Sequence, residues 1–270
     1  MFDPRGMPRL FALPPGVDFA QALVAGLRTR LSGKPPEAMA QVEIYVNAPR
    51  LARQVRAVFD AGPPSLLPRI RLVTDLADPV TAAQLPQAVP PLRRRLELTG
   101  LVARLLETQP DLAPRAALFD LSDSLARLMD EMIAEDVSPR AIEALDVTDQ
   151  SGHWQRALRF FRIVQQFVDA DAAPDTGGLQ RLALAARVAA WNAAPPGHPV
   201  IVAGSTGSRG TTHAFMRAVA RLPQGAVVLP GFDPDMPDAV WAHMGDALQA
   251  EDHPQFRLGT LMRDLRVTPS

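Results

Sequence analysis

Residues 14–18, PPGVD, form a turn in which a nucleotide phosphate would bind if the required side chains were present. A phosphate-binding loop needs several glycines, so that backbone N–H groups surround the phosphates, together with a lysine and a hydroxyl that binds Mg²⁺. Gly16 is the only glycine of this turn, and Asp18 brings a negative charge to the segment that follows. Lys34, the only lysine of the chain, is followed by a proline instead of a hydroxyl residue. We interpret Pro15, Gly16 and Asp18 as a degenerate phosphate loop and expect no cofactor there.

A second turn, AGSTG at 203–207, follows an aliphatic run and resembles a nucleophile elbow in which alanine replaces the first glycine. In that interpretation Ser205 is the nucleophile, and Asp233 and either His243 or His253 complete a hydrolase triad. Only one further strand is expected after Ser205, whereas a hydrolase fold places its acid and its histidine after later strands. A serine hydrolase centred on Ser205 is kept as an alternative.

The same turn also resembles a dinucleotide-binding loop. Gly204, Gly207 and Gly210 have the spacing G-x-x-G-x-x-G instead of G-x-G-x-x-G, and Asp233 lies further along the chain than a ribose ligand usually does. A nicotinamide-binding module at Gly204–Gly210 is therefore a second alternative. The favoured interpretation is a structural turn, in which small residues join a strand to a helix that is capped by one of the following threonines.

Three arginines recur at i, i+3 and i+6 after the second aliphatic run, and an asparagine stands where that run ends: Arg50, Arg53, Arg56 and Asn47. On a helix this spacing keeps the arginines near one face. Such a row can pair with the phosphates of a DNA strand, and a solvated helix face is the alternative. These four residues are our candidates for DNA binding.

The composition excludes several kinds of site. The chain of 270 residues has a net charge of −1, 47% hydrophobic residues and no cysteine, so disulfides, thiolate zinc sites and iron–sulfur clusters are excluded within it. Its five histidines form no H-x-x-x-H pair, and no metal site is predicted. No apolar run is long enough to span a membrane, and the first residues lack a secretory signal, so we expect a cytoplasmic protein.

Strand and helix patterns alternate towards both ends of the chain and give way to helix alone between them. Aliphatic runs that predict strands lie at 9–13, 42–46, 70–73, 200–203 and 226–229. Helical periodicity without strands lies at 91–108, 115–136, 152–170 and 178–193. This order predicts a parallel α/β domain over 1–90 and 196–270, interrupted by a helical insertion over 91–195. The last residues, RVTPS, follow soon after a strand–helix unit, and we expect the chain to be the N-terminal piece of a longer polypeptide.

Long phrases of the sequence resemble one family. The opening PRLFALPPGVDFAQALVAGLRTRL and the later VEIYVNAPRLARQVRAVFDAGPPSLLPRIRLVTDLAD are similar to the N-terminus of the AddB subunit of bacterial AddAB helicase–nucleases, in its alphaproteobacterial form. LFDLSDSLARLMDEMIAEDV, HPVIVAGSTGSRGTTHAFMRAVARLPQGAVVLPGFD and the tail DHPQFRLGTLMRDLRV also resemble that family, so the resemblance covers nearly the whole chain.

The resemblance implies a P-loop sheet domain like domain 1A of SF1 helicases, carrying an all-helical insertion like domain 1B. The segment VNAPRLA at 46–52 then occupies the place of motif Ia, which contacts single-stranded DNA in such helicases. Gly204 and Ser205 stand where an active helicase has the acidic pair that binds Mg²⁺. The Walker B region is therefore expected to be as degenerate as the Walker A region.

The resemblance also implies partners and a process. Members of the family pair with AddA, which supplies the ATP-driven motor, and the heterodimer resects DNA double-strand breaks for homologous recombination. Their C-terminal nuclease domain, with its iron–sulfur cluster and Mg²⁺, is expected to lie outside these residues. We therefore expect an inactive helicase-like module that binds and guides DNA and acts as a scaffold for the heterodimer.

Overall fold

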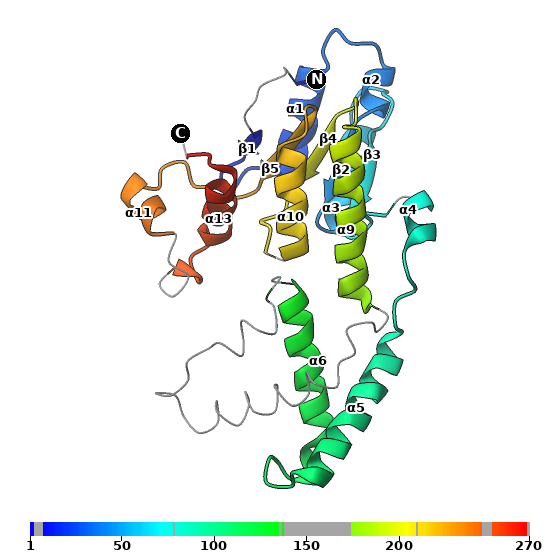
Figure 1. Cartoon of the computed structure of the whole chain (residues 1–270). Coiled ribbons are helices and arrows are strands. Elements are labelled where there is room, and N and C mark those ends of the chain that lie inside the picture. Colours follow the sequence, from blue (N-terminus) through cyan, green and yellow to red (C-terminus); the bar gives the residue numbers. More distant parts are fainter. Residues whose placement is uncertain are drawn as a thin grey trace. The chain divides into compact units, whose positions relative to one another are not determined.

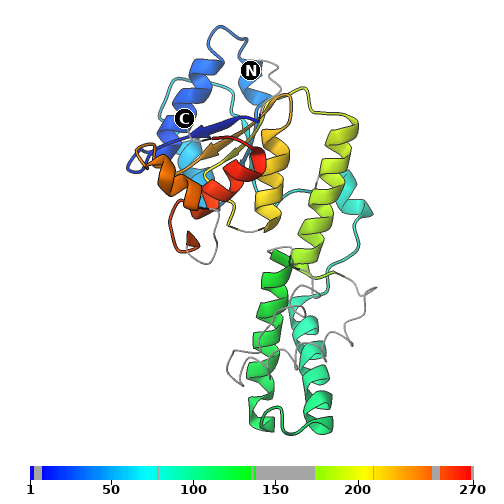
Figure 2. The same cartoon turned by 60° about the vertical axis from the view of Figure 1, so that its left-hand side comes forward.

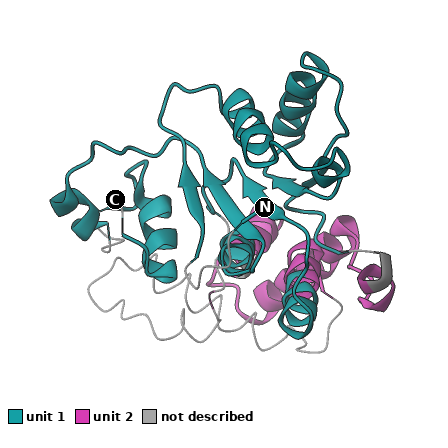
Figure 3. Ribbon diagram, turned by 90° about the horizontal axis from the view of Figure 1, so that it is seen from above, with its two compact units in different colours: residues 1–78, 184–270 teal, residues 79–183 magenta. Residues whose placement is uncertain are grey.

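The computed structural model describes residues 1–2, 8–77, 79–134, 137, 174–208, 210–244 and 250–268. The chain divides into two compact units: unit 1 comprises residues 1–78 and 184–270, and unit 2 comprises residues 79–183 (Figure 3). The boundaries expected from the sequence lay at 90 and 195. Helix α9 (Thr176–Ala193) begins in unit 2 and ends in unit 1.

Unit 1 contains a sheet of five parallel strands in the order β1-β5-β4-β2-β3 (Figures 1 and 2). The strands are β1 (Leu10–Ala12), β2 (Glu43–Val46), β3 (Arg69–Leu72), β4 (Val200–Ala203) and β5 (Gly225–Leu229). These positions confirm all five strands predicted from the aliphatic runs. The register places Ile44 of β2 beside Ile70 of β3 and Ile201 of β4. Because β1 and β3 each pair with one strand only, they form the edges of the sheet.

Helices α1 (Phe19–Arg30) and α3 (Pro49–Asp60) cover one face of this sheet (Figure 2). Their buried residues include Leu23 and Leu27 of α1 and Val55 and Phe59 of α3, and each pair is spaced four residues apart on the inner face of its helix. These pack with strand residues that alternate along β2 and β4, namely Ile44, Val46, Ile201 and Ala203. The short helix α2 (Glu37–Ala40) precedes β2.

The opposite face of β2 carries Glu43 and Tyr45, because successive side chains of a strand point to opposite faces. The Tyr45 ring meets Phe215 of helix α10 (Gly210–Ala220) edge to face, with ring centroids 4.8 Å apart. Trp191 of α9 stacks on the same phenylalanine at 5.9 Å. An aromatic layer therefore fills the space between this face and helices α9 and α10.

The C-terminal part of unit 1 contains helices α11 (Asp238–His243) and α13 (Phe256–Leu265). Helix α13 buries Leu258, Leu261 and Leu265. It is also joined to α10 by a hydrogen bond, in which His213 Nε2 lies 2.9 Å from Asp264 Oδ2, and by an ion pair of Arg217 with the same carboxylate. The C-terminal segment is thus packed onto the sheet unit by both apolar and charged contacts.

Unit 2 contains helices α4 (Pro79–Gln84), α5 (Pro91–Thr108) and α6 (Leu118–Ala134), the 3₁₀ turn η1 (Arg115–Ala117) and the start of α9. Helices α5 and α6 pack together around a core that includes Val102, Leu105 and Leu125. Ion pairs of Arg94 with Asp130 and of Arg95 with Asp123 also link the two helices. The helix predicted at 152–170 lies outside the described residues.

Candidate nucleic-acid interface

The loop after β1 offers few hydrogen-bond donors to a phosphate. Pro14 and Pro15 have no backbone N–H, and Gly16 adopts a left-handed conformation with φ of 82°. Asp18 caps α1, because its Oδ1 accepts a hydrogen bond from Gln21 N at 3.0 Å. A carboxylate therefore occupies the end of the helix at which a phosphate would be favoured.

Lys34 lies beyond the opposite end of α1. That helix has 12 residues, which corresponds to a length of about 18 Å. A lysine that contacts the phosphates must lie at the start of the helix that follows the loop. The fold therefore places the only lysine far from the loop after β1.

The end of β4 is covered by apolar side chains. Gly204 has a φ of 76°, and a Cβ atom at this position would lie 2.3 Å from Leu51 Cδ2 and 3.3 Å from Phe19 Cε1. Leu51 comes from α3 and Phe19 opens α1, so both helices close over the end of β4. Gly204, one of the two residues interpreted as a degenerate Walker B region, thus lies beneath a packed apolar contact.

Ser205 is 6% exposed, and its Oγ accepts a hydrogen bond from Gly207 N at 3.2 Å. The acid and the two histidines considered as triad partners make local hydrogen bonds: Asp233 with Asp235 N, His243 with Ala239 O, and His253 with Gln255 N. Within the described parts of the chain, no hydrogen bond joins any of the three to Ser205. A general base must lie within hydrogen-bonding reach of its nucleophile.

The glycines of the suggested dinucleotide loop have a structural use. Gly207 has a φ of 71°, and a Cβ there would lie 3.3 Å from both His213 Nδ1 and Met216 Sδ. Gly210 is the first residue of α10. The spacing of these glycines is therefore explained by a tight turn that packs against the helix it precedes.

The predicted arginine row is exposed on α3, opposite the buried Val55 and Phe59. Asn47 follows β2 directly, and α3 begins with Pro49, so Asn47 and Arg50 lie at the carboxyl edge of the sheet. Arg53 and Arg56 continue the row, which extends for about 9 Å along the helix. In the part of the chain that the structure covers, Arg50, Arg53 and Arg56 form no ion pair with a carboxylate.

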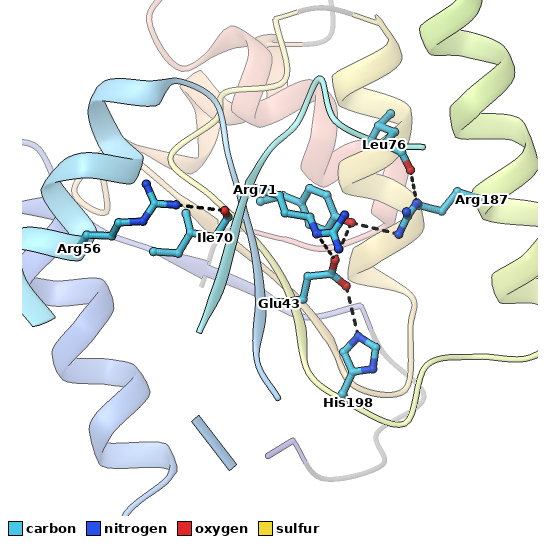
Figure 4. Close-up of polar contacts among 8 residues, drawn as sticks. Glu43, Arg56, Ile70, Arg71, Leu76, Arg187 and His198 are labelled. Carbon is cyan, nitrogen blue, oxygen red and sulfur yellow. Dashed lines mark hydrogen bonds and ion pairs between the residues drawn. The ribbon is translucent and has the colours of Figure 1, made fainter. Parts of the chain in front are cut away.

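A buried polar network that was not predicted from the sequence joins Tyr45 to Glu43 and Arg187 (Figure 4). The Tyr45 hydroxyl donates to Glu43 Oε1 at 3.0 Å and accepts from Arg187 Nη1 at 3.0 Å. Arg71 Nε lies 2.9 Å from Glu43 Oε1, and His198 Nε2 lies 3.2 Å from Glu43 Oε2. The buried glutamate thus has three partners, as a buried carboxylate requires.

Arg187 connects this network to the end of the β3 segment, because its Nε donates to the carbonyl oxygen of Leu76. Burial raises the pKa of Tyr45 well above its usual value, and the neighbouring Glu43 carboxylate raises it further. The sequence contains one sign of this network, the E-x-Y spacing in VEIYV, because residues two apart on a strand share a face and can form a hydrogen bond there.

Comparison with models of known protein families finds no match, and comparison with curated proteins finds none either. The fold places the chain in the α/β class. Its five-stranded, all-parallel sheet is compatible with a Rossmann-like or P-loop-like architecture. Among the described residues, no group of three or more His, Asp or Glu side chains is arranged to hold a metal ion. Over the same residues, no helix combines the length and the apolar character of a membrane span.

Proposed function

We propose that this chain is a helicase-like module that binds and guides single-stranded DNA without using a nucleotide itself. The observation that carries the proposal is the contrast along the carboxyl edge of the sheet. At β4, Phe19 and Leu51 fill the space above Gly204, where a nucleotide would need room. At β2, the exposed Asn47 is followed on α3 by a row of exposed arginines that no described carboxylate neutralises.

The shape and chemistry of the row suit a polyanion. Arg50, Arg53 and Arg56 are carried by one rigid helix, so their guanidinium groups are spaced regularly along its exposed face. Contacts of arginine with phosphate are charge-assisted, and they position a strand without reading its sequence. We therefore assign the row a role in guiding DNA, independent of sequence.

We further propose that the chain is the N-terminal part of an AddB-type subunit of a double-strand-break repair helicase–nuclease. The sequence phrases quoted above support this assignment, and so does a parallel sheet that is interrupted by a separate unit between β3 and β4. In that setting an AddA-type partner would supply ATP-driven movement. The nuclease centre, with its iron–sulfur cluster and Mg²⁺, would belong to other residues.

Nucleotide binding tests the first part of the proposal. A fluorescent ATP analogue titrated against the chain, with and without Mg²⁺, is expected to show no saturable signal. The physical reason is that the β1 loop presents a carboxylate and two prolines where a phosphate needs N–H donors and a lysine. Mg²⁺-dependent binding at micromolar concentration would refute the proposal.

DNA binding tests the second part. Replacing Arg50, Arg53 and Arg56 with glutamine is expected to weaken binding of a fluorescent oligothymidine. It should also reduce the slope of log K against log salt by about 2, at roughly 0.7 per phosphate contact on a single strand.

A matched variant controls for net charge. It replaces three exposed arginines of unit 2 with glutamine, which lowers the net charge equally: Arg104, Arg115 and Arg127. The control is expected to keep the salt dependence of the parent chain. If both triple variants show the same slope as the parent, the row on α3 is only a solvated face.

A further inference from the structure

Strand β3 leaves one side of its backbone open. It pairs with β2 alone, and the bonds from Arg69 N to Val42 O (2.8 Å) and from Val73 N to Val46 O (2.9 Å) point inwards. Because N–H groups alternate between the two sides of a strand, those of Ile70 and Leu72 point away from β2. No other strand of the described chain pairs with this outer side.

The carbonyl groups on the outer side are only partly used. The Leu72 carbonyl accepts a hydrogen bond from Asp75 N at 2.9 Å, which turns the chain after the strand. The Ile70 carbonyl accepts from Arg56 Nη2 at 3.5 Å, at the long limit for a hydrogen bond (Figure 4). The outer edge therefore offers two N–H donors and one weakly engaged acceptor.

The side chains around this edge are basic and apolar. Arg56 and Arg69 are exposed at the amino half of β3, whereas Asp75 follows its carboxyl end. Leu66 and Leu67, in the segment that leads into the strand, are 46% and 43% exposed. A ligand for this edge must therefore be extended and partly aliphatic, with negative charge opposite the amino half of β3.

We infer that the outer edge of β3 binds an extended acidic and aliphatic segment of a partner protein, which adds to the sheet as a further strand. Main-chain hydrogen bonds to Ile70 and Leu72 supply the affinity, and Arg69 selects for acidic side chains. A second copy of this chain fits poorly, because edge-to-edge pairing would place arginine opposite arginine. The inference does not depend on the DNA-binding proposal, since it rests on the open backbone of β3.

A synthetic peptide of nine alternating valine and glutamate residues, capped at both ends, tests the inference on the full chain. Binding is followed by fluorescence anisotropy and by amide hydrogen exchange. The peptide is expected to slow exchange of the Ile70 and Leu72 amides at least tenfold, while the inward Arg71 amide stays unchanged. Unchanged exchange at Ile70 and Leu72 would overturn the inference.

Two modified peptides separate the contributions. A peptide with lysine in place of glutamate is expected to bind about tenfold more weakly or worse, because its charge no longer complements the arginine side chains. A peptide methylated at alternate backbone nitrogens is expected to lose as much affinity, because it cannot form the main-chain hydrogen bonds. Equal binding of all three peptides would contradict strand addition. Slowed exchange at Ile70 and Leu72 with oligothymidine, but not with the acidic peptide, would identify the edge as a nucleic-acid site and overturn the inference.

Variants of the chain give an independent measurement. Arg69→Glu is expected to weaken binding of the acidic peptide about tenfold, because it reverses the charge beside the open edge. Arg221→Glu makes the same change in net charge at an exposed position that follows α10, and it should leave peptide binding unaltered. Equal loss of affinity in the two variants would contradict a site at β3.

Discussion

Alkaline titration examines the buried network around Tyr45, because few other groups of this protein titrate above pH 9. Tyr45 is the only tyrosine, Lys34 is the only lysine, and cysteine is absent. Arginine stays protonated throughout this range. A change in stability near pH 10–11 can therefore be attributed to very few groups.

The sign and the size of the effect follow from the environment of Tyr45. This side chain is fully buried, and burial together with Glu43 holds its pKa above that of the unfolded chain. A group whose folded pKa is raised stabilises the fold fully below the unfolded pKa, and this contribution is lost as the pH rises above about 10. The free energy of unfolding should then fall by about 1.4 kcal/mol by pH 11.

Urea denaturation followed by tryptophan fluorescence at several pH values between 8 and 11 measures this loss. Absorbance at 295 nm reports tyrosinate directly, and it should rise only with unfolding. Tyr45→Phe should remove the pH dependence. At neutral pH the variant should cost about 1–3 kcal/mol, because Glu43 and Arg187 each lose one buried partner. Tyrosinate absorbance near pH 10 in a chain that is still folded would refute the reasoning, as would an unchanged pH slope in the phenylalanine variant.

Three further predictions concern the carboxyl edge of the sheet. Gly204→Ala should lower the free energy of unfolding by about 2–4 kcal/mol, because the new Cβ would collide with Leu51 and the alanine would have to adopt a left-handed φ. Gly16→Ala should lower it by only about 1 kcal/mol, because a Cβ there meets no atom within 4 Å and only the left-handed φ is unfavourable. Urea titrations of the two variants measure the difference. Asp18→Ala should cost about 1 kcal/mol through loss of the α1 cap, measured in the same way, and an Asp18→Asn variant should recover most of it. A fluorophosphonate probe should leave Ser205 unlabelled in the folded chain, and labelling seen by peptide mass spectrometry would revive the hydrolase alternative.

The strands and the inner faces of α1, α3 and α10 could be predicted from the sequence because they depend on local pattern. Buried parallel strands are short aliphatic runs, and an amphipathic helix repeats its apolar residues every three to four positions. The cap that Asp18 forms is local in the same sense, since an N-cap acts within one turn of its own helix. The arginine row was also found in this way, and its exposure on α3 agrees with the spacing.

The packing of residues that are distant in sequence could not be predicted. Phe19 and Leu51 meet over Gly204, and the sequence does not show this contact, because it depends on the strand order. The contact of Glu43 with His198 joins β2 to the segment that leads into β4, 155 residues further along the chain. Charge pairing across such a distance leaves no periodic pattern in the sequence.

The hydrogen bond from Arg187 to the Leu76 carbonyl bears on how the chain can be divided (Figure 4). Leu76 is one of the last residues of unit 1 before unit 2, and Arg187 is one of the first after it. The two points where the chain leaves and rejoins the sheet unit therefore lie within the length of one side chain. When the ends of an insertion are held together in this way, its length has only a logarithmic effect on the closure entropy. We therefore expect that a short linker can replace the residues between α4 and α9, with α9 kept whole, and leave the sheet unit folded.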